Sequence, residues 1–174
     1  MTQPGAPVIR SAGGRLALRL DESERRILAS LVAELRAELE DPASATPDGS
    51  LARLYPPAFP DDRDAEAGYR ELVRDGLVAG RLEQVAAVEA TLDAPELDEA
   101  QAAAWMGVLN DLRLALGARL GVEDDAPGIT EFGPGDAEDP DAMRRALFLY
   151  LGWLVESFVD VLAGSLPDGP GSGG

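Results

Sequence analysis

Apolar and polar residues alternate along residues 15–20, which is the period of a strand with one buried face. A second short apolar run begins at Val8, and the pair Gly13-Gly14 lies between the two runs. Glycines accept the backbone conformations that a tight turn requires. The pattern therefore predicts a β-hairpin over residues 8–20.

From residue 22 onward the apolar residues recur every three or four positions, which is the period of an amphipathic helix. Prolines, glycines and acidic capping residues separate the runs, and a kink or break is expected near Gly76. We expect a mainly α protein, a helical bundle with a short N-terminal β-hairpin. A single domain over residues 8–166 lies between disordered tails at 1–7 and 167–174. The predicted helices cover residues about 22–40, 64–75, 76–92, 97–120 and 140–163.

The last predicted helix begins at Asp139-Pro140, a capping residue followed by a proline that suits a first turn. Over residues 147–155 its apolar side chains point in every direction around the helix axis. A helix that is apolar on all sides must be covered on all sides. Either the helices that carry Ile27 and Trp105 surround it within one chain, or part of it is a homodimer interface. We favour the first arrangement, which makes this helix the central element of the fold.

The composition excludes several kinds of functional site. The chain has no cysteine and no histidine, so it has no disulfide, thiol nucleophile or imidazole base. Its 32 acidic and 15 basic residues, the latter all arginine, give a formal net charge of −17. Such a surface repels nucleic acid and anionic lipid, which disfavours direct DNA binding.

The N-terminus lacks the basic and apolar regions of a signal peptide. The longest apolar run, residues 146–155, reaches only about half of a membrane span. We therefore expect a cytoplasmic protein with no membrane contact and no cofactor.

Carboxylates are the remaining candidates for metal binding. The acidic segment 123–141 offers the oxygen ligands that Ca²⁺ and Mg²⁺ prefer, but its spacing departs from that of an EF-hand loop. Glu156 and Asp160 lie four positions apart on the last helix, as carboxylates of a Mg²⁺-dependent helical hydrolase would. The tight acidic doublets of such hydrolases are missing, and Glu156 instead suits an ion pair with Arg113 inside the bundle. We expect no catalytic or metal-binding residue and keep the hydrolase as an alternative.

Two groups of residues are candidates for contacts with a protein partner. Tyr55 and Phe59 lie in a loop with several prolines, which limits the entropy lost on binding. Alternatively, their rings close the edge of the core. Asn110, Asp111 and Arg113 interrupt the apolar pattern of a strong helix. They form either a recognition face or a buried hydrogen-bond network that fixes the helix register.

Residues 53–62, 109–121 and 153–157 resemble an actinobacterial family long catalogued as a domain of unknown function. Some members of that family are described as AosR-type oxidative-stress transcriptional regulators. The resemblance covers nearly the whole chain, from residue 8 to residue 162. It implies a helical regulator that acts through protein partners.

The resemblance implies two classes of partner. One is the transcription machinery, contacted under oxidative stress. The other is the Clp-protease adaptor system, because genes of the family often neighbour a Clp adaptor gene. Thiol-based redox sensing does not carry over, because the chain has no cysteine. We expect a non-enzymatic regulatory protein of the stress response that works by protein–protein interaction.

Overall fold

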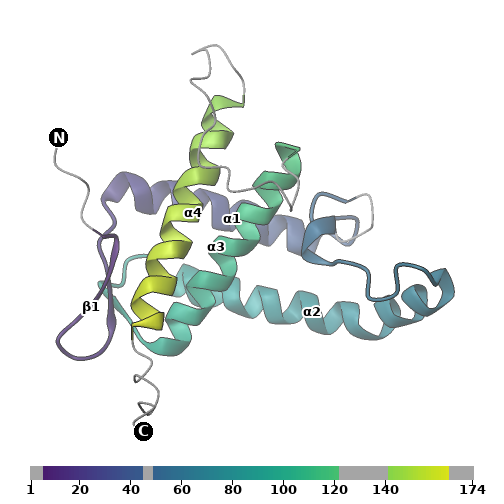
Figure 1. Cartoon of the computed structure of the whole chain (residues 1–174), viewed down its shortest axis with the longest axis horizontal. Coiled ribbons are helices and arrows are strands. Elements are labelled where there is room, and N and C mark those ends of the chain that lie inside the picture. The colour runs from purple at the N-terminus through teal and green to yellow at the C-terminus, as the bar shows by residue number, and fades with distance from the viewer. Residues whose placement is uncertain (1–5, 45–48, 122–140, 165–174) are drawn as a thin grey trace, which may run out of the picture.

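Helices make up most of the structure, a computed structural model that describes residues 6–44, 49–121 and 141–164 (Figure 1). Most of the two predicted tails lies outside these ranges. The prediction of a mainly α fold with an N-terminal hairpin is confirmed. Within the described ranges the elements are the strands β1 (Val8–Arg10), β2 (Leu16–Leu18) and β3 (Glu96–Leu97), the 3₁₀ turn η1 (Ala52–Leu54), and the helices α1 (Glu22–Glu40), α2 (Arg63–Thr91), α3 (Glu99–Arg119) and α4 (Ala142–Ala163).

The two predicted strands pair as an antiparallel hairpin, with Val8 opposite Leu18 and Arg10 opposite Leu16. In the turn, Gly14 has a φ of 79°, a left-handed conformation that glycine adopts without strain. A third strand, β3, pairs with the other edge of β2. The sequence pattern does not predict β3, because two residues are too few to show an alternation.

Reciprocal caps fix where α1 and α3 begin. The Asp21 carboxylate accepts a hydrogen bond from the backbone N–H of Glu24 at 2.8 Å, and the Glu24 carboxylate accepts one from the N–H of Asp21 at 2.7 Å. Asp98 and Gln101 form the same pair at the start of α3. Such a capping box satisfies N–H groups that a helix leaves unpaired at its first turn. As a result α3 begins at Glu99 rather than at residue 97.

Residues 63–91 form one continuous helix, so the predicted division into 64–75 and 76–92 is wrong. Gly76 lies inside this helix, with nothing within 4 Å of the position that a Cβ would occupy. A glycine in an exposed helix costs only about 1 kcal/mol relative to alanine. The leucines, alanines, glutamates and arginines around Gly76 are good helix formers and outweigh that cost.

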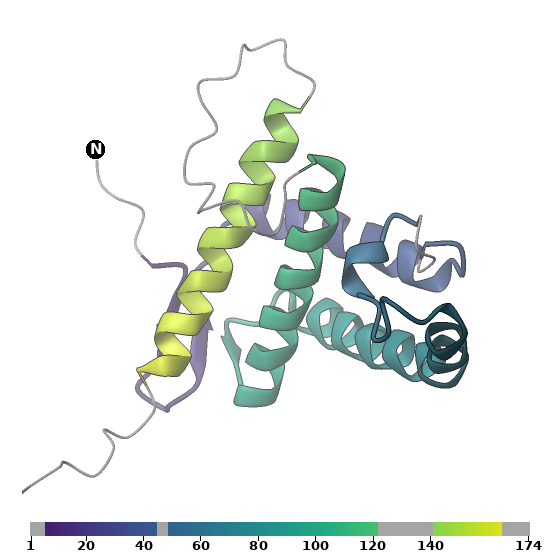
Figure 2. The ribbon, with the colours of Figure 1, turned by 45° about the vertical axis from the view of Figure 1, so that its right-hand side comes forward.

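α3 is the central element of the fold, because α2 packs on one side of it and α4 on another (Figures 1 and 2). Its Trp105 is buried, and the indole N–H donates to the Thr91 hydroxyl at 2.8 Å. The same ring stacks on Phe158, with centroids 6.4 Å apart. Thr91 belongs to α2 and Phe158 to α4, so Trp105 connects three helices at one point.

The prediction that α4 is the central helix, covered on every side, is wrong. α4 packs mainly against α3 and β1, and its Tyr150 hydroxyl donates a hydrogen bond to the Glu24 carboxylate of α1 at 3.0 Å, whereas α2 packs against α3 and α1. Ile27 of α1 is exposed rather than packed on α4. On the outer side of α4, Leu149 and Val159 are exposed and Trp153 is half-buried. The residues of α4 that are buried are Phe148, Leu151, Leu154 and Phe158.

By length and composition alone, α4 is apolar enough to cross a membrane, with a mean hydropathy of 1.7 over its most apolar stretch. The core helix of a globular protein passes the same test. The predicted start of this helix, Asp139-Pro140, lies outside the described residues, and the described helix begins after Asp141.

Candidate functional site

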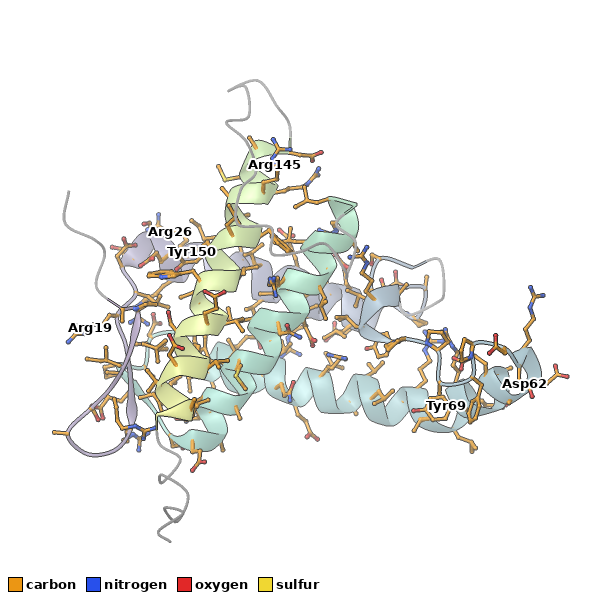
Figure 3. All side chains as sticks on the ribbon, in the orientation of Figure 1. Arg19, Arg26, Asp62, Tyr69, Arg145 and Tyr150 are labelled. Carbon is orange, nitrogen blue, oxygen red and sulfur yellow. The ribbon has the colours of Figure 1, made fainter. Side chains whose placement is uncertain are left out.

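The first half of α2 and the loop that precedes it project away from the other helices (Figures 1 and 2). We name this part, residues 51–77, the arm. Figure 3 shows its Asp62 and Tyr69 on the opposite side of the molecule from Tyr150 of α4. The arm carries two of the five candidate partner-binding residues, Tyr55 and Phe59.

Apolar contacts hold the base of the arm. Leu51 and Leu54 are buried where η1 packs against α3. Tyr55 follows directly and is also buried, whereas Phe59 is exposed. The structure therefore places one aromatic residue of this loop at the edge of the core and the other at the surface.

Two acidic side chains fasten the loop to the start of α2. The Asp62 carboxylate accepts hydrogen bonds from two backbone N–H groups of the first turn, at 3.1 and 3.0 Å. Glu66 accepts one from Arg70 Nε at 2.6 Å and one from the backbone N–H of Phe59 at 2.9 Å. These two bonds, that from Arg70 first, hold the pKa of Glu66 below its ordinary value. The position of Phe59 is thus set by a charged side chain.

A partly buried ion pair joins α2 to α3 at the base of the arm. Arg81 of α2 pairs with Asp111 of α3 and donates a further hydrogen bond to the carbonyl oxygen of Leu54 at 2.9 Å. Its guanidinium also lies over the Tyr55 ring, 5.2 Å from the centroid. Asp111 is only 5% exposed, and this burial raises its pKa, while the charge of Arg81 opposes the rise. Arg81 therefore brings Tyr55 and Asp111 into one cluster.

Sequence reasoning singled out Tyr55 and Asp111 but missed Arg81, which connects them. A signal was present in the helical period of α2. Arg81 lies four and seven positions before Val85 and Val88, which are both buried. A charged residue on the buried face of a helix needs an acidic partner, because an unpaired buried charge is costly.

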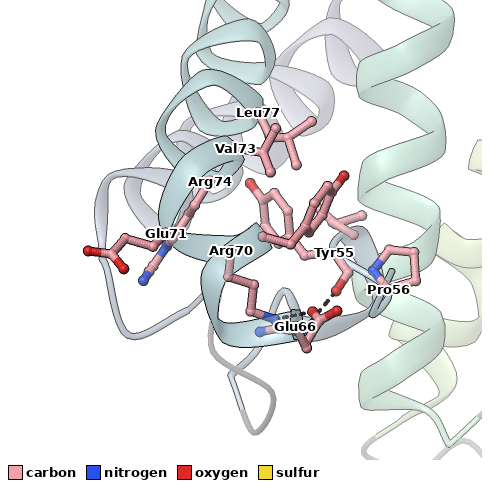
Figure 4. A pocket seen from close by; sticks show the side chains of 10 residues that line it. Tyr55, Pro56, Glu66, Arg70, Glu71, Val73, Arg74 and Leu77 are labelled. Carbon is pink, nitrogen blue, oxygen red and sulfur yellow. Dashed lines mark hydrogen bonds and ion pairs between the residues drawn. The ribbon is translucent and has the colours of Figure 1, made fainter. Parts of the chain in front are cut away.

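A pocket of about 420 Å³ opens beside this cluster, between the loop and α2 (Figure 4). The Tyr55 hydroxyl is buried and has no hydrogen-bond partner among the described residues. Burial raises the pKa of this hydroxyl, while the charge of Arg81 lowers it. The pocket wall combines apolar and charged side chains, among them Tyr55, Val73, Leu77, Glu66, Arg70 and Arg74.

Exposed apolar residues are concentrated in the arm, and two of them, Tyr69 and Leu77, line this pocket. Of the eight large apolar side chains that the structure shows as exposed, four belong to the arm. Leu72 is the most open of them, at 87% exposure. Phe59 and Tyr69 pack edge to face with ring centroids 5.9 Å apart. Such a concentration of apolar surface beside a concavity is typical of an interaction site. The four residues are Phe59, Tyr69, Leu72 and Leu77.

The structure does not bring the other two candidates to the arm. Asn110 and Arg113 are exposed on α3. The guanidinium of Arg113 lies over the Phe148 ring of α4, 5.0 Å from the centroid. The expected pairing of Arg113 with Glu156 inside the bundle is therefore wrong, because Glu156 is exposed. Arg113 covers an aromatic ring of the core instead.

The carboxylates considered for metal binding do not form a cluster in the described part of the chain. Glu156 and Asp160 are both exposed on α4. Among the residues that the structure describes, no three acidic, histidine or cysteine side chains lie close enough together to hold a metal ion. The acidic segment 123–141 lies outside the described residues except at its last position.

The fold and the arm define a mainly α protein that carries a pocket of mixed apolar and charged lining on a projecting helix. The chain belongs to the family described as Domain of unknown function (DUF2017), whose profile matches residues 5–162. No curated protein and no solved structure matches the chain.

Proposed function

We propose that this chain is a non-enzymatic regulatory protein that works by binding another protein through the arm. The observation that carries the proposal is the pocket beside Tyr55, with exposed Tyr69 and Leu77 in its wall and exposed Phe59 packed on Tyr69. Interfaces owe most of their affinity to a few apolar or aromatic anchors that enter such pockets. Exposed aromatic side chains of this kind are costly to keep in water unless a partner covers them.

The contacts around the pocket support binding without a large rearrangement. Glu66 fastens the loop to α2, and the Arg81–Asp111 pair fastens both to α3. A surface that is already ordered loses little conformational entropy when its partner binds. The partner that fits has an apolar side chain for the pocket and a hydrogen-bond acceptor for the Tyr55 hydroxyl.

The AosR-type resemblance adds two partner classes to this proposal. In the first, the arm binds a component of the transcription machinery during oxidative stress, inside the cytoplasm. In the second, it binds a component of the Clp-protease adaptor system. In both, the stress signal reaches the protein through its partner, because no thiol is present to sense it. Direct contact with DNA plays no part, since the net charge of −17 repels phosphate.

The experiment is native co-purification with mass spectrometry from the source organism, using two matched variants. Leu77 in the pocket wall and Ile27 on α1 are both 44% exposed, so Leu77→Asp and Ile27→Asp perturb the fold to a similar extent. We expect the partner to be lost from Leu77→Asp and kept by Ile27→Asp. Equal retention by the two variants, or equal loss, would contradict a role of the arm.

A further inference from the structure

The outer side of α4 carries a second apolar surface, separate from the arm. Leu149 is exposed there, and half-buried Trp153 follows it one turn later along the helix. In Figure 1 α4 lies at the front of the molecule, and no other described element covers this side in either view of the ribbon. Buried Leu151 and Phe158 mark the opposite face, which packs on α3.

Charged residues flank this apolar surface in a definite order. Arg145, Leu149, Trp153, Glu156 and Asp160 follow one another at spacings of three or four, so they share one stripe along the helix. We name it the α4 stripe. It is positive near the start of the helix, apolar in the middle and negative toward the end.

When two copies of the stripe run in opposite directions, the positive end of one lies against the negative end of the other and the apolar middles meet. Consider two antiparallel copies of α4 related by a two-fold axis that is perpendicular to the helices and passes at the level of Leu151. Leu149 of one copy then meets Trp153 of the other. The same symmetry places Arg145 of each copy beside Glu156 of the other, with Asp160 one turn further along. We propose that the α4 stripe is the interface of a homodimer, formed by α4 of one copy against α4 of a second. Two-fold contacts of this kind use the same patch on both copies.

A second copy fits the stripe better than a lipid surface does. Arg145, Glu156 and Asp160 would have to enter the hydrocarbon along with Leu149 and Trp153, and charged side chains are strongly disfavoured there. In an antiparallel pair Arg145 of each copy lies beside Glu156 of the other, so charges that oppose burial in lipid are compatible with the dimer.

The expected affinity is modest. α4 has 22 residues and is therefore about 33 Å long. One helix packed on one helix buries no more than the low end of the range for stable interfaces, about 1,200 Å². The dimer should form at micromolar concentration and dissociate on dilution.

The test is sedimentation of the whole chain over a roughly hundredfold range of protein concentration in the micromolar region. We expect a reversible dimer whose dissociation constant Leu149→Asp raises at least about tenfold, because a charge enters the middle of the stripe. Leu77→Asp, which changes the arm, should leave the dimer unchanged. Far-UV dichroism and melting establish that each variant is folded.

A charge exchange tests the antiparallel arrangement. Arg145→Glu and Glu156→Arg should each weaken the dimer, and the double variant should restore it, because every copy then carries the reversed pair. A chain that stays monomeric throughout, a dimer that Leu149→Asp leaves intact, or a double variant weaker than both single variants would overturn the proposal. So would a monomer that floats with phosphatidylcholine vesicles and loses that binding in Leu149→Asp. None of these outcomes depends on whether the arm binds a partner.

Discussion

Replacing Arg81 with methionine removes the positive charge between α2 and α3 but keeps most of the apolar length of the side chain. In the folded protein the Asp111 carboxylate then remains buried without its ion-pair partner. The carbonyl oxygen of Leu54 loses its hydrogen bond from the same guanidinium. Both changes act at the base of the arm, where Tyr55 meets the core.

The structure sets the size of the effect. Breaking a fully buried ion pair by removing one partner costs about 3–5 kcal/mol. The Asp111 side chain is 7% exposed, but that of Arg81 is 25% exposed, so water reaches one end of the pair. This access reduces the cost, and we expect Arg81→Met to lower the free energy of unfolding by about 2–3 kcal/mol. Replacing both partners by apolar residues should cost less than the sum of the single changes.

Urea unfolding of Arg81→Met, Asp111→Leu and the double variant measures these free energies. We expect a coupling of at least about 1 kcal/mol between the two positions. The pH dependence of the free energy of unfolding is a second test of the same reasoning. Without Arg81, burial raises the folded pKa of Asp111 further above its unfolded value, so the folded state binds the proton more tightly. The stability deficit of Arg81→Met should therefore shrink as the pH falls toward that pKa. A loss below about 1 kcal/mol, or simple additivity, would refute the reasoning.

Three further predictions concern the arm, the core and the metal alternative. The pKa of Glu66 is lowered in the folded state, so its contribution to stability is present above the ordinary carboxyl pKa and is lost as the pH falls through the lowered value. Glu66→Gln should therefore speed hydrogen exchange at Phe59 near neutral pH and have little effect once the wild-type carboxyl is protonated. Phe158→Ala should cost about 3–5 kcal/mol in urea unfolding, and Trp153→Ala clearly less, because Phe158 is buried and Trp153 is half-buried. Equal costs would show that the outer side of α4 is covered. Millimolar Mg²⁺ or Mn²⁺ should leave the melting temperature unchanged, whereas a rise of several degrees would favour the hydrolase.

Local signals predicted the parts of the fold that local interactions determine. Asp21 and Glu24 are three residues apart, and the capping box they form begins α1 where the sequence placed it. The Gly13-Gly14 turn and the alternation after it gave the hairpin. In each case the residues that carry the signal also make the contact, so no distant partner is needed.

The errors concern arrangements that distant residues decide. Gly76 interrupts the apolar pattern of α2 without breaking the helix, because the helix formers around it outweigh its cost. Which sides of α4 are buried depends on which other helices pack against it. Helical periodicity predicts that α4 is apolar but not which elements pack on it. α2 packs on α1 and α3, and α1 meets α4 at Tyr150, so no described helix covers Leu149 on the outer side of α4.

The candidate site was predicted in part, for a related reason. Tyr55 and Asp111 stood out because each breaks the pattern of its own segment. Arg81 did not, because an arginine is ordinary in a long helix whose surface is largely charged. Only the fold places it between residues that lie 27 positions before it and 30 after it. The pocket likewise needs the loop and α2 to be brought together before it exists.

The two proposed surfaces have a joint consequence. The arm and the α4 stripe lie on different sides of α3, so one chain can use both at once (Figure 1). A homodimer through α4 then presents two arms. A partner with two copies of the recognised segment binds both arms, and the second contact forms at the high effective concentration set by the first. Its overall affinity exceeds that of one arm by a factor of about 10²–10⁴ when the spacing matches. Because the dimer is weak, this gain depends on the concentration of the chain itself. A rise in the amount of the protein would then increase binding more than proportionally, which is a form of regulation that requires no cysteine.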